Sequence, residues 1–121
     1  MKIKTANLIG IPLNWVVDKC EGGDPRNMAG YIMPEFIGRF ATDWAQGGPI
    51  IEREFMDVEV TPCGSGQGAP FDTWRAWKHN HSADAAVVCG PTPLIAAMRC
   101  YVASKLGDEV EIPDELLKEL P

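Results

Sequence analysis

The stretch from Gly90 to Gly107, G-P-T-P-L-I-A-A-M-R-C-Y-V-A-S-K-L-G, specifies one complete helix. Thr92 is a residue type that caps the free N–H groups of a first turn. Pro93 suits the first helical position, because its missing N–H costs nothing there. Gly107 can adopt the left-handed conformation that commonly ends a helix. The sequence therefore predicts a long C-terminal helix over residues 92–106.

Apolar side chains recur along this helix at the spacing of a single face. They are Leu94, Ile95, Met98, Tyr101, Val102 and Leu106. Arg99 falls on the side away from Leu94, Met98 and Tyr101, so we expect it at the surface. An amphipathic helix of this kind must lay its apolar face on another element, and the strand-like segments before it are the expected surface.

Three segments before the long helix have the alternation or apolar content of strands, namely 57–61, 71–79 and 85–89. In the first of them, Val58 and Val60 should point inward. A weaker strand signal spans 108–112, and a helical tail starts at Pro113. The glycine-rich segment 62–70 is predicted to be a mobile loop, and residues 80–84 a turn.

The N-terminal half is predicted to be mainly helical. Thr5 can cap a first helical segment, and Pro12 can restart a helix that runs through Cys20 to Gly22-Gly23. Thr42-Asp43 can cap a short turn, after which Gly47-Gly48-Pro49 opens a brief helix ending near Arg53. Residues 24–41 give no clear element, although their apolar side chains predict some packing.

This order of elements predicts an α+β fold, in which a small antiparallel sheet is covered by helices in an α-β-α sandwich-like arrangement. The 121 residues suffice for one domain, residues 1–121. The net charge of −6 argues against general nucleic-acid binding. The chain has no apolar run of membrane-spanning length and no signal peptide, which predicts a cytoplasmic protein.

The cysteines and histidines predict neither a metal nor another cofactor. Cys63, Cys89, His79 and His81 do not show the spacing of a zinc site. All four cysteines, which also include Cys20 and Cys100, are expected to be reduced thiols, mostly buried. No nucleophile lies on a recognisable catalytic turn, and C-G-S-G-Q-G from Cys63 lacks the Lys of a phosphate-binding loop. We therefore do not expect an enzyme.

Two predicted helix starts beside glycines suggest a binding site for an anion. The segments Gly47-Gly48-Pro49 and Gly90-Pro91-Thr92 would present backbone N–H groups and the positive end of a helix dipole. Arginine can pair with phosphate, and tryptophan can stack on a nucleobase. The predicted ligand-binding residues are Trp44, Asp43, Gly47, Gly48, Arg53, Trp77, Thr92 and Arg99. The alternative for each of them is capping, a surface salt bridge or core packing.

Two long segments resemble a known family. A-T-D-W-A-Q-G-G-P-I-I-E-R-E from Ala41 to Glu54 and the string from Gly90 to Pro113 are similar to the NinX-like proteins of lambdoid phages and prophages. The opening M-K-I-K-T and the helix containing Trp15 match as well. More distantly, the chain resembles small phage domains with an α-β-α sandwich. The resemblance implies a phage protein acting in the infected bacterial cell, and it supplies no mechanism.

Two hypotheses of function follow. The first is a phage accessory protein that binds and sequesters a small anionic, nucleotide-derived ligand, such as a signalling molecule of host immunity, without catalysis. The alternative is a protein–protein adaptor or inhibitor that docks on a host enzyme through its negative charge and loop aromatics. A homo-oligomer is expected, because sites of the first kind often lie between subunits.

Overall fold

The computed structural model describes residues 1–60, 74–78 and 87–119. Within these residues the fold has three α-helices and two small antiparallel sheets. The α-helices are α1 (Gly10–Cys20), α2 (Trp44–Arg53) and α3 (Pro93–Leu106). The strands are β1 (Lys2–Lys4), β2 (Met56–Val60), β3 (Trp74–Lys78), β4 (Val88–Gly90) and β5 (Glu109–Glu111). Three short 3-10 helices are η1 (Thr5–Asn7), η2 (Pro34–Phe36) and η3 (Asp114–Glu119). The predicted α+β class is confirmed, with the sheet divided in two.

The larger sheet has the strand order β2-β3-β4, and the smaller one pairs β1 with β5. In the smaller sheet Lys2 lies opposite Glu111 and Lys4 opposite Glu109, so opposite charges face each other across the ladder. The N-terminal strand was not predicted, because three residues carry too little alternation. Its partner lies more than a hundred residues along the chain, which only the tertiary fold reveals.

The predicted ends of the long helix are confirmed at α3. The hydroxyl of Thr92 accepts a hydrogen bond from the N–H of Ile95 at 3.1 Å, and Pro93 occupies the first turn. At the other end, Gly107 has a φ of +88° and its N–H donates to the carbonyl of Ala103. These local interactions explain why the sequence alone located this helix correctly.

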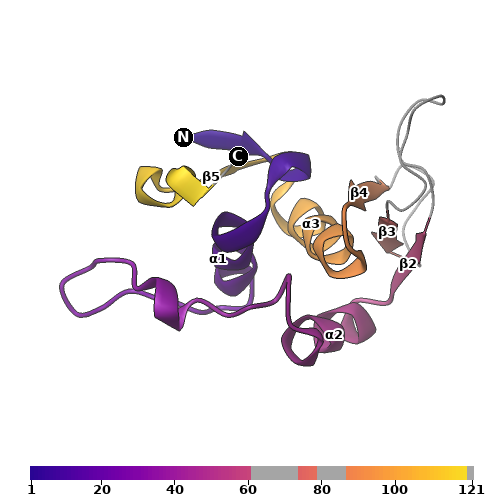
Figure 1. The fold of residues 1–121 in the computed structure, drawn as a ribbon, viewed down its shortest axis with the longest axis horizontal. Helices are drawn as coiled ribbons and strands as arrows, with labels where there is room; N and C mark the ends of the chain where they lie inside the picture. Colours follow the sequence, from indigo (N-terminus) through magenta and orange to yellow (C-terminus); the bar gives the residue numbers. More distant parts are fainter. Residues whose placement is uncertain (61–73, 79–86, 120–121) are drawn as a thin grey trace.

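The prediction of a single apolar face on α3 was wrong. The nine consecutive residues from Leu94 to Val102 are all buried, with Arg99 among them. Figure 1 shows the cause: α3 lies between α1 on one side and the β2-β3-β4 sheet on the other. The near-continuous apolar run L-I-A-A-M was the available signal, because a helix that is apolar all round is typical of a core.

Helix α2 begins three residues earlier than predicted, at Trp44 rather than Gly47. The side chain of Asp43 caps it by accepting a hydrogen bond from the N–H of Ala45 at 2.9 Å. Gly47 and Gly48 consequently lie inside the helix, and the N–H of Gly47 donates to the carbonyl of Asp43 at 2.9 Å. The Thr-Asp cap therefore starts the helix, and the glycines do not form a helix start that could bind an anion.

The strands of the β2-β3-β4 sheet lie where the sequence predicts them, but not every side chain has the predicted burial. Strand β2 matches the predicted strand, with Met56 buried and Val58 half-buried. Val60, expected to point inward, is 54% exposed. The predicted strands 71–79 and 85–89 are represented by β3 and β4. The predicted loop 62–70 and turn 80–84 lie outside the described residues.

Two further expectations, on Thr5 and on the cysteines, are corrected. Thr5 begins a 3-10 turn rather than an α-helix, and its hydroxyl donates to the carbonyl of Gly107 at 2.7 Å. Segment 24–41 packs in part, as expected: Ile32 and Ile37 are buried, Arg26 and Ile32 form an antiparallel bridge, and η2 follows. Cys89 takes part in a disulfide, so four reduced thiols were the wrong expectation. Cys20 and Cys100 are free thiols.

The contact between α2 and α3 depends on a glycine. A Cβ atom on Gly47 would lie 2.3 Å from the backbone oxygen of Phe40 and 2.6 Å from Cδ2 of Leu94. Gly48 differs, because the nearest atom to its Cβ position is Cε3 of Trp44 at 3.9 Å.

We expect Gly47→Ala to destabilise the protein by about 1–3 kcal/mol, since overpacking forces the backbone to move. The matched variant Gly48→Ala should be neutral or stabilising by up to about 1 kcal/mol, because alanine favours helix. Urea unfolding monitored by circular dichroism measures both. Equal effects of the two substitutions would contradict this close approach of the helices.

Candidate ligand pocket and charged cluster

An open pocket of about 260 Å³ lies where the starts of α2 and α3 meet. It is lined by Ala41, Thr42, Trp44, Thr92, Pro93, Leu94 and Ile95. Two predicted site residues, Trp44 and Thr92, thus come together although they are 48 positions apart in the sequence. The lining is mostly apolar, with hydroxyl groups from Thr42 and Thr92.

The segment just before α2, which lines one side of the pocket, is held in place by hydrogen bonds. The N–H of Ala41 donates to the side-chain oxygen of Asn14 on α1 at 2.9 Å. The N–H groups of Thr42 and Asp43 both donate to the carbonyl of Arg39. This turn, which is anchored to α1, fixes where Trp44 begins its helix. The indole of Trp44 remains 55% exposed, which suits a stacking surface.

Most first-turn donors at the pocket already have partners. At α3 the N–H of Ile95 donates to the hydroxyl of Thr92, and the N–H of Ala96 donates to the carbonyl of Thr92. Pro93 has no N–H group. At α2 the carboxylate of Asp43 binds the N–H of Ala45. The N–H of Leu94 is left as the first-turn donor of α3 for a ligand, since a helix offers it no internal acceptor.

The predicted arginines do not line this pocket. Arg99 is 9% exposed and lies inside the core. Its Nε donates to the carbonyl of Leu8 at 2.7 Å, and one terminal nitrogen donates to the carbonyl of Cys89 at 2.9 Å. Burial lowers the pKa of this guanidinium. Its expected surface position was wrong, and Arg99 instead joins the N-terminal segment to β4.

Trp77 lies on β3 and is not among the residues that line the pocket. Its ring faces the guanidinium of Arg75 at 5.3 Å, and Arg75 also pairs with Glu59 on β2. Trp77 is therefore engaged by a cation of its own sheet. Of the predicted set, Trp44 and Thr92 line the pocket, Asp43 caps the adjacent helix, and Gly47 sets the contact beneath it.

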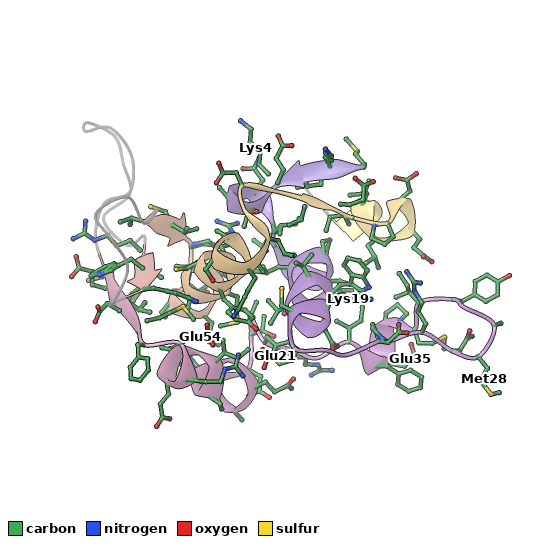
Figure 2. All side chains as sticks on the ribbon, turned by 180° about the vertical axis from the view of Figure 1, so that it is seen from behind. Lys4, Lys19, Glu21, Met28, Glu35 and Glu54 are labelled. Atoms are coloured by element: carbon green, nitrogen blue, oxygen red, sulfur yellow. The ribbon has the colours of Figure 1, made fainter. Side chains whose placement is uncertain are left out.

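Arg53 belongs to a second arrangement, which we call the charged cluster. It consists of Glu21, Arg53, Glu54, Lys78, Tyr101 and Lys105. Arg53 binds both carboxylate oxygens of Glu21, at 2.9 and 2.7 Å, and one oxygen of Glu54 at 3.0 Å. Figure 2 shows Glu21 and Glu54 close together where α1, α2 and α3 meet. The cluster joins the C-terminal ends of α1 and α2 to β3 and α3.

The charges of the cluster satisfy one another. Lys78 donates to Glu54 at 2.8 Å and, with Arg53, lowers the pKa of that carboxyl to about 2. The hydrogen bonds from Arg53 and from the Tyr101 hydroxyl lower the pKa of Glu21. Burial and the contact with Glu21 raise the pKa of Tyr101. The cluster therefore has a structural role, and the guanidinium of Arg53 is engaged within it.

The described residues hold no group of three or more His, Cys, Asp or Glu side chains placed to bind a metal ion. Cys63, His79 and His81 lie outside those residues. Over the same part of the chain, no helix is long and apolar enough to cross a membrane.

The depressed pKa of Glu54 predicts a pH-dependent contribution to stability. This contribution is fully present above the ordinary glutamate pKa of 4.5 and is lost as the pH falls through about 2. We expect Glu54→Gln to lower the free energy of unfolding at neutral pH, with a difference from wild type that shrinks below pH 4.5. Urea unfolding at a series of pH values measures this. Glu52→Gln, at an exposed position in the last turn of α2, is the control. A difference that stays constant with pH would contradict the assignment.

Comparison with known proteins identifies the family of the chain. Among curated proteins none matches the chain. The family described as Bacteriophage P22, NinX matches residues 4–105, which include both helix starts of the pocket and the whole charged cluster. The segments 41–54 and 90–113, on which the sequence resemblance rests, are also the two that meet at the pocket. The chain therefore belongs to the phage NinX family.

Proposed function

We propose that this phage protein binds and sequesters a small anionic, nucleotide-derived ligand in the pocket between α2 and α3, without turning it over. One observation carries the proposal: the half-exposed indole of Trp44 shares an open pocket with the start of α3. A planar ring can stack on Trp44 while its polar substituents meet the hydroxyls of Thr42 and Thr92.

The size of the pocket limits what it can hold. Pockets for whole drug-sized ligands occupy roughly 300–1,000 Å³, and this one is about 260 Å³. It therefore suits one base or one sugar-phosphate part, and the remainder of a larger ligand would lie outside it.

The attraction for an anion comes from backbone rather than from side chains. None of the described lining residues is charged. The positive dipole end of α3 and the N–H of Leu94 favour negative charge. At α2, the carboxylate of Asp43 already interacts with the positive end of the helix dipole. Binding should consequently depend only modestly on salt.

The lining also supports binding without chemistry. Threonine hydroxyls and apolar side chains offer no general acid or base within the ordinary pH range. A phage protein that captures a host signalling nucleotide needs affinity alone, and it would act in the cytoplasm of the infected cell.

The test is titration calorimetry of the full chain against cyclic dinucleotides, cyclic ADP-ribose isomers and common mononucleotides. We expect one of these to bind, and Trp44→Ala to weaken that binding about tenfold or more. Trp44→Phe should retain most of the affinity, because it keeps a stacking face. Phe36→Ala, which removes another exposed aromatic, should leave affinity unchanged. Absence of binding across the panel would contradict the proposal.

A second candidate, an adaptor that docks on a host protein, is favoured by the arm, which we define as residues 24–37. Figures 1 and 2 show it projecting away from α1, with Met28 at its far end. Met28 is fully exposed, Tyr31 is 67% exposed and Phe36 is 64% exposed. The side chain of Asn27 accepts from the N–H groups of Ala29 and Tyr31, each at 3.0 Å, so the turn is ordered.

The adaptor function requires a partner with an apolar groove for these side chains. We expect the triple variant Met28→Ser, Tyr31→Ser, Phe36→Ser to lose capture of such a protein from host lysate while keeping its fold. Trp44→Ala should capture it as well as wild type does. Capture that survives the triple variant would exclude the arm as the docking surface.

A further inference from the structure

Arg99 is a buried cation whose charge is not neutralised within the described residues. Its two hydrogen bonds go to the backbone carbonyls of Leu8 and Cys89, and none of the ion pairs in that part of the chain includes it. Burial lowers the pKa of Arg99, and no carboxylate among those residues counteracts this effect. Buried charges in proteins are normally paired with an opposite charge. The position of Arg99 therefore favours an anion from outside the chain.

The start of α1 is a second feature that favours an anion. Ile9, the residue before this helix, has no polar side chain to cap it, and the first turn holds no acidic residue. Helices α2 and α3 differ, because Asp43 and Thr92 cap them. The N–H groups of Gly10 and Ile11 have no acceptor within the helix, as is general for a first turn. They are therefore available to an anion, together with the positive end of the α1 dipole.

Arg99 and the start of α1 lie at one junction. The Nε of Arg99 donates to the carbonyl of Leu8 at 2.7 Å, and Leu8 is two positions before the first residue of α1. The Cα atoms of Leu8 and Gly10 are consequently at most about 7 Å apart. Helix α3 and strand β4 both contact η1, the turn that leads into α1 (Figure 1). The buried cation and the positive helix end thus lie close together, which is unfavourable unless an anion lies between them.

The junction is accessible on the side of α1. Leu8 is fully buried, whereas Gly10 and Ile11 are half-buried. A Cβ atom on Gly10 would have no atom within 4 Å, so the space beside the first N–H groups is open. The φ of Gly10 is +63°, a conformation in which glycine lets a ligand approach the backbone closely. The hydrogen bond from Arg99 to Cys89 is only partly buried, so part of the guanidinium lies near the surface.

We propose that Arg99 and the first turn of α1 together bind a phosphate group. The oxygens of a tetrahedral anion point in several directions, so one can accept from the guanidinium of Arg99 and another from the N–H of Gly10 or Ile11. Hydrogen bonds of about 2.9 Å on each side of the anion span the separation of these donors. The site is distinct from the pocket between α2 and α3, whose lining includes neither Arg99 nor any residue of α1.

Thermal unfolding of the full chain in inorganic phosphate, methyl phosphate or chloride at equal ionic strength tests the site. Phosphate should raise the melting temperature above that in chloride, because an anion bound only by the folded chain stabilises it. Methyl phosphate, which has neither base nor sugar, distinguishes the sources of the group. Equal stabilisation by both anions assigns a phosphate monoester to the site, and stabilisation by inorganic phosphate alone assigns the free ion. No stabilisation by either anion would overturn the proposal.

Ile9→Asp separates the role of the site from that of the fold. The introduced carboxylate would cap α1 and lie beside Arg99, so the dissociation constant for phosphate should rise about tenfold or more. The cap itself favours the helix. The matched variant Ile9→Asn caps without adding charge and should weaken binding less. Arg39→Gln removes an exposed arginine and should change nothing. Phosphate affinity that is equal in Ile9→Asp and wild type would contradict the proposal.

Arg99→Gln should also raise the dissociation constant about tenfold or more, provided that the variant folds. Amide NMR spectra of the wild type localise the anion without any substitution. Phosphate should shift the resonances of Gly10 and Ile11 most. Shifts centred on Leu94 would place the phosphate in the pocket and overturn this site. Trp44→Ala should bind phosphate as wild type does, so this test and the nucleotide titration can fail independently.

Discussion

The burial of α3 around its whole circumference is the constraint on which the rest of the described structure depends. Helices α1 and α2, strands β2 to β5 and the turn η1 all contact it. A helix this short can be enclosed on every side only if small residues let neighbours approach, and Ala96 and Ala97 supply that space. Gly90 does the same on the sheet side, where a Cβ would lie 2.7 Å from the nitrogen of Ala96.

The packing around α3 also determines which groups the two arginines contact. Arg99 is enclosed with α3 and is retained there by two backbone carbonyls, from Leu8 and Cys89. An arginine without such acceptors would be very costly to bury. Arg53 is drawn into the charged cluster, where two carboxylates neutralise it. Both arginines that the sequence assigned to a ligand are thus engaged within the fold. In the proposed pocket, backbone dipoles provide the attraction for an anion instead.

Helix α2 shapes the pocket. Gly47 sets the distance to α3, because a Cβ atom there would meet Leu94 and the backbone of Phe40. Trp44, at the start of the same helix, lines the pocket and is half-exposed. One short helix thus determines both the width of the pocket and the position of its proposed stacking surface.

The sequence by itself determined the features that depend on neighbouring residues. The Thr92 cap, Pro93 and Gly107 locate α3, and the alternation around Val58 locates β2, because these signals act within a few positions. Tertiary structure alone decided the rest. The buried position of Arg99 depends on the two segments whose carbonyls bind it, and the sequence does not show that these segments meet there. The meeting of Trp44 with Thr92 and the pairing of β1 with β5 likewise join distant segments, and no local pattern encodes which of them pack together.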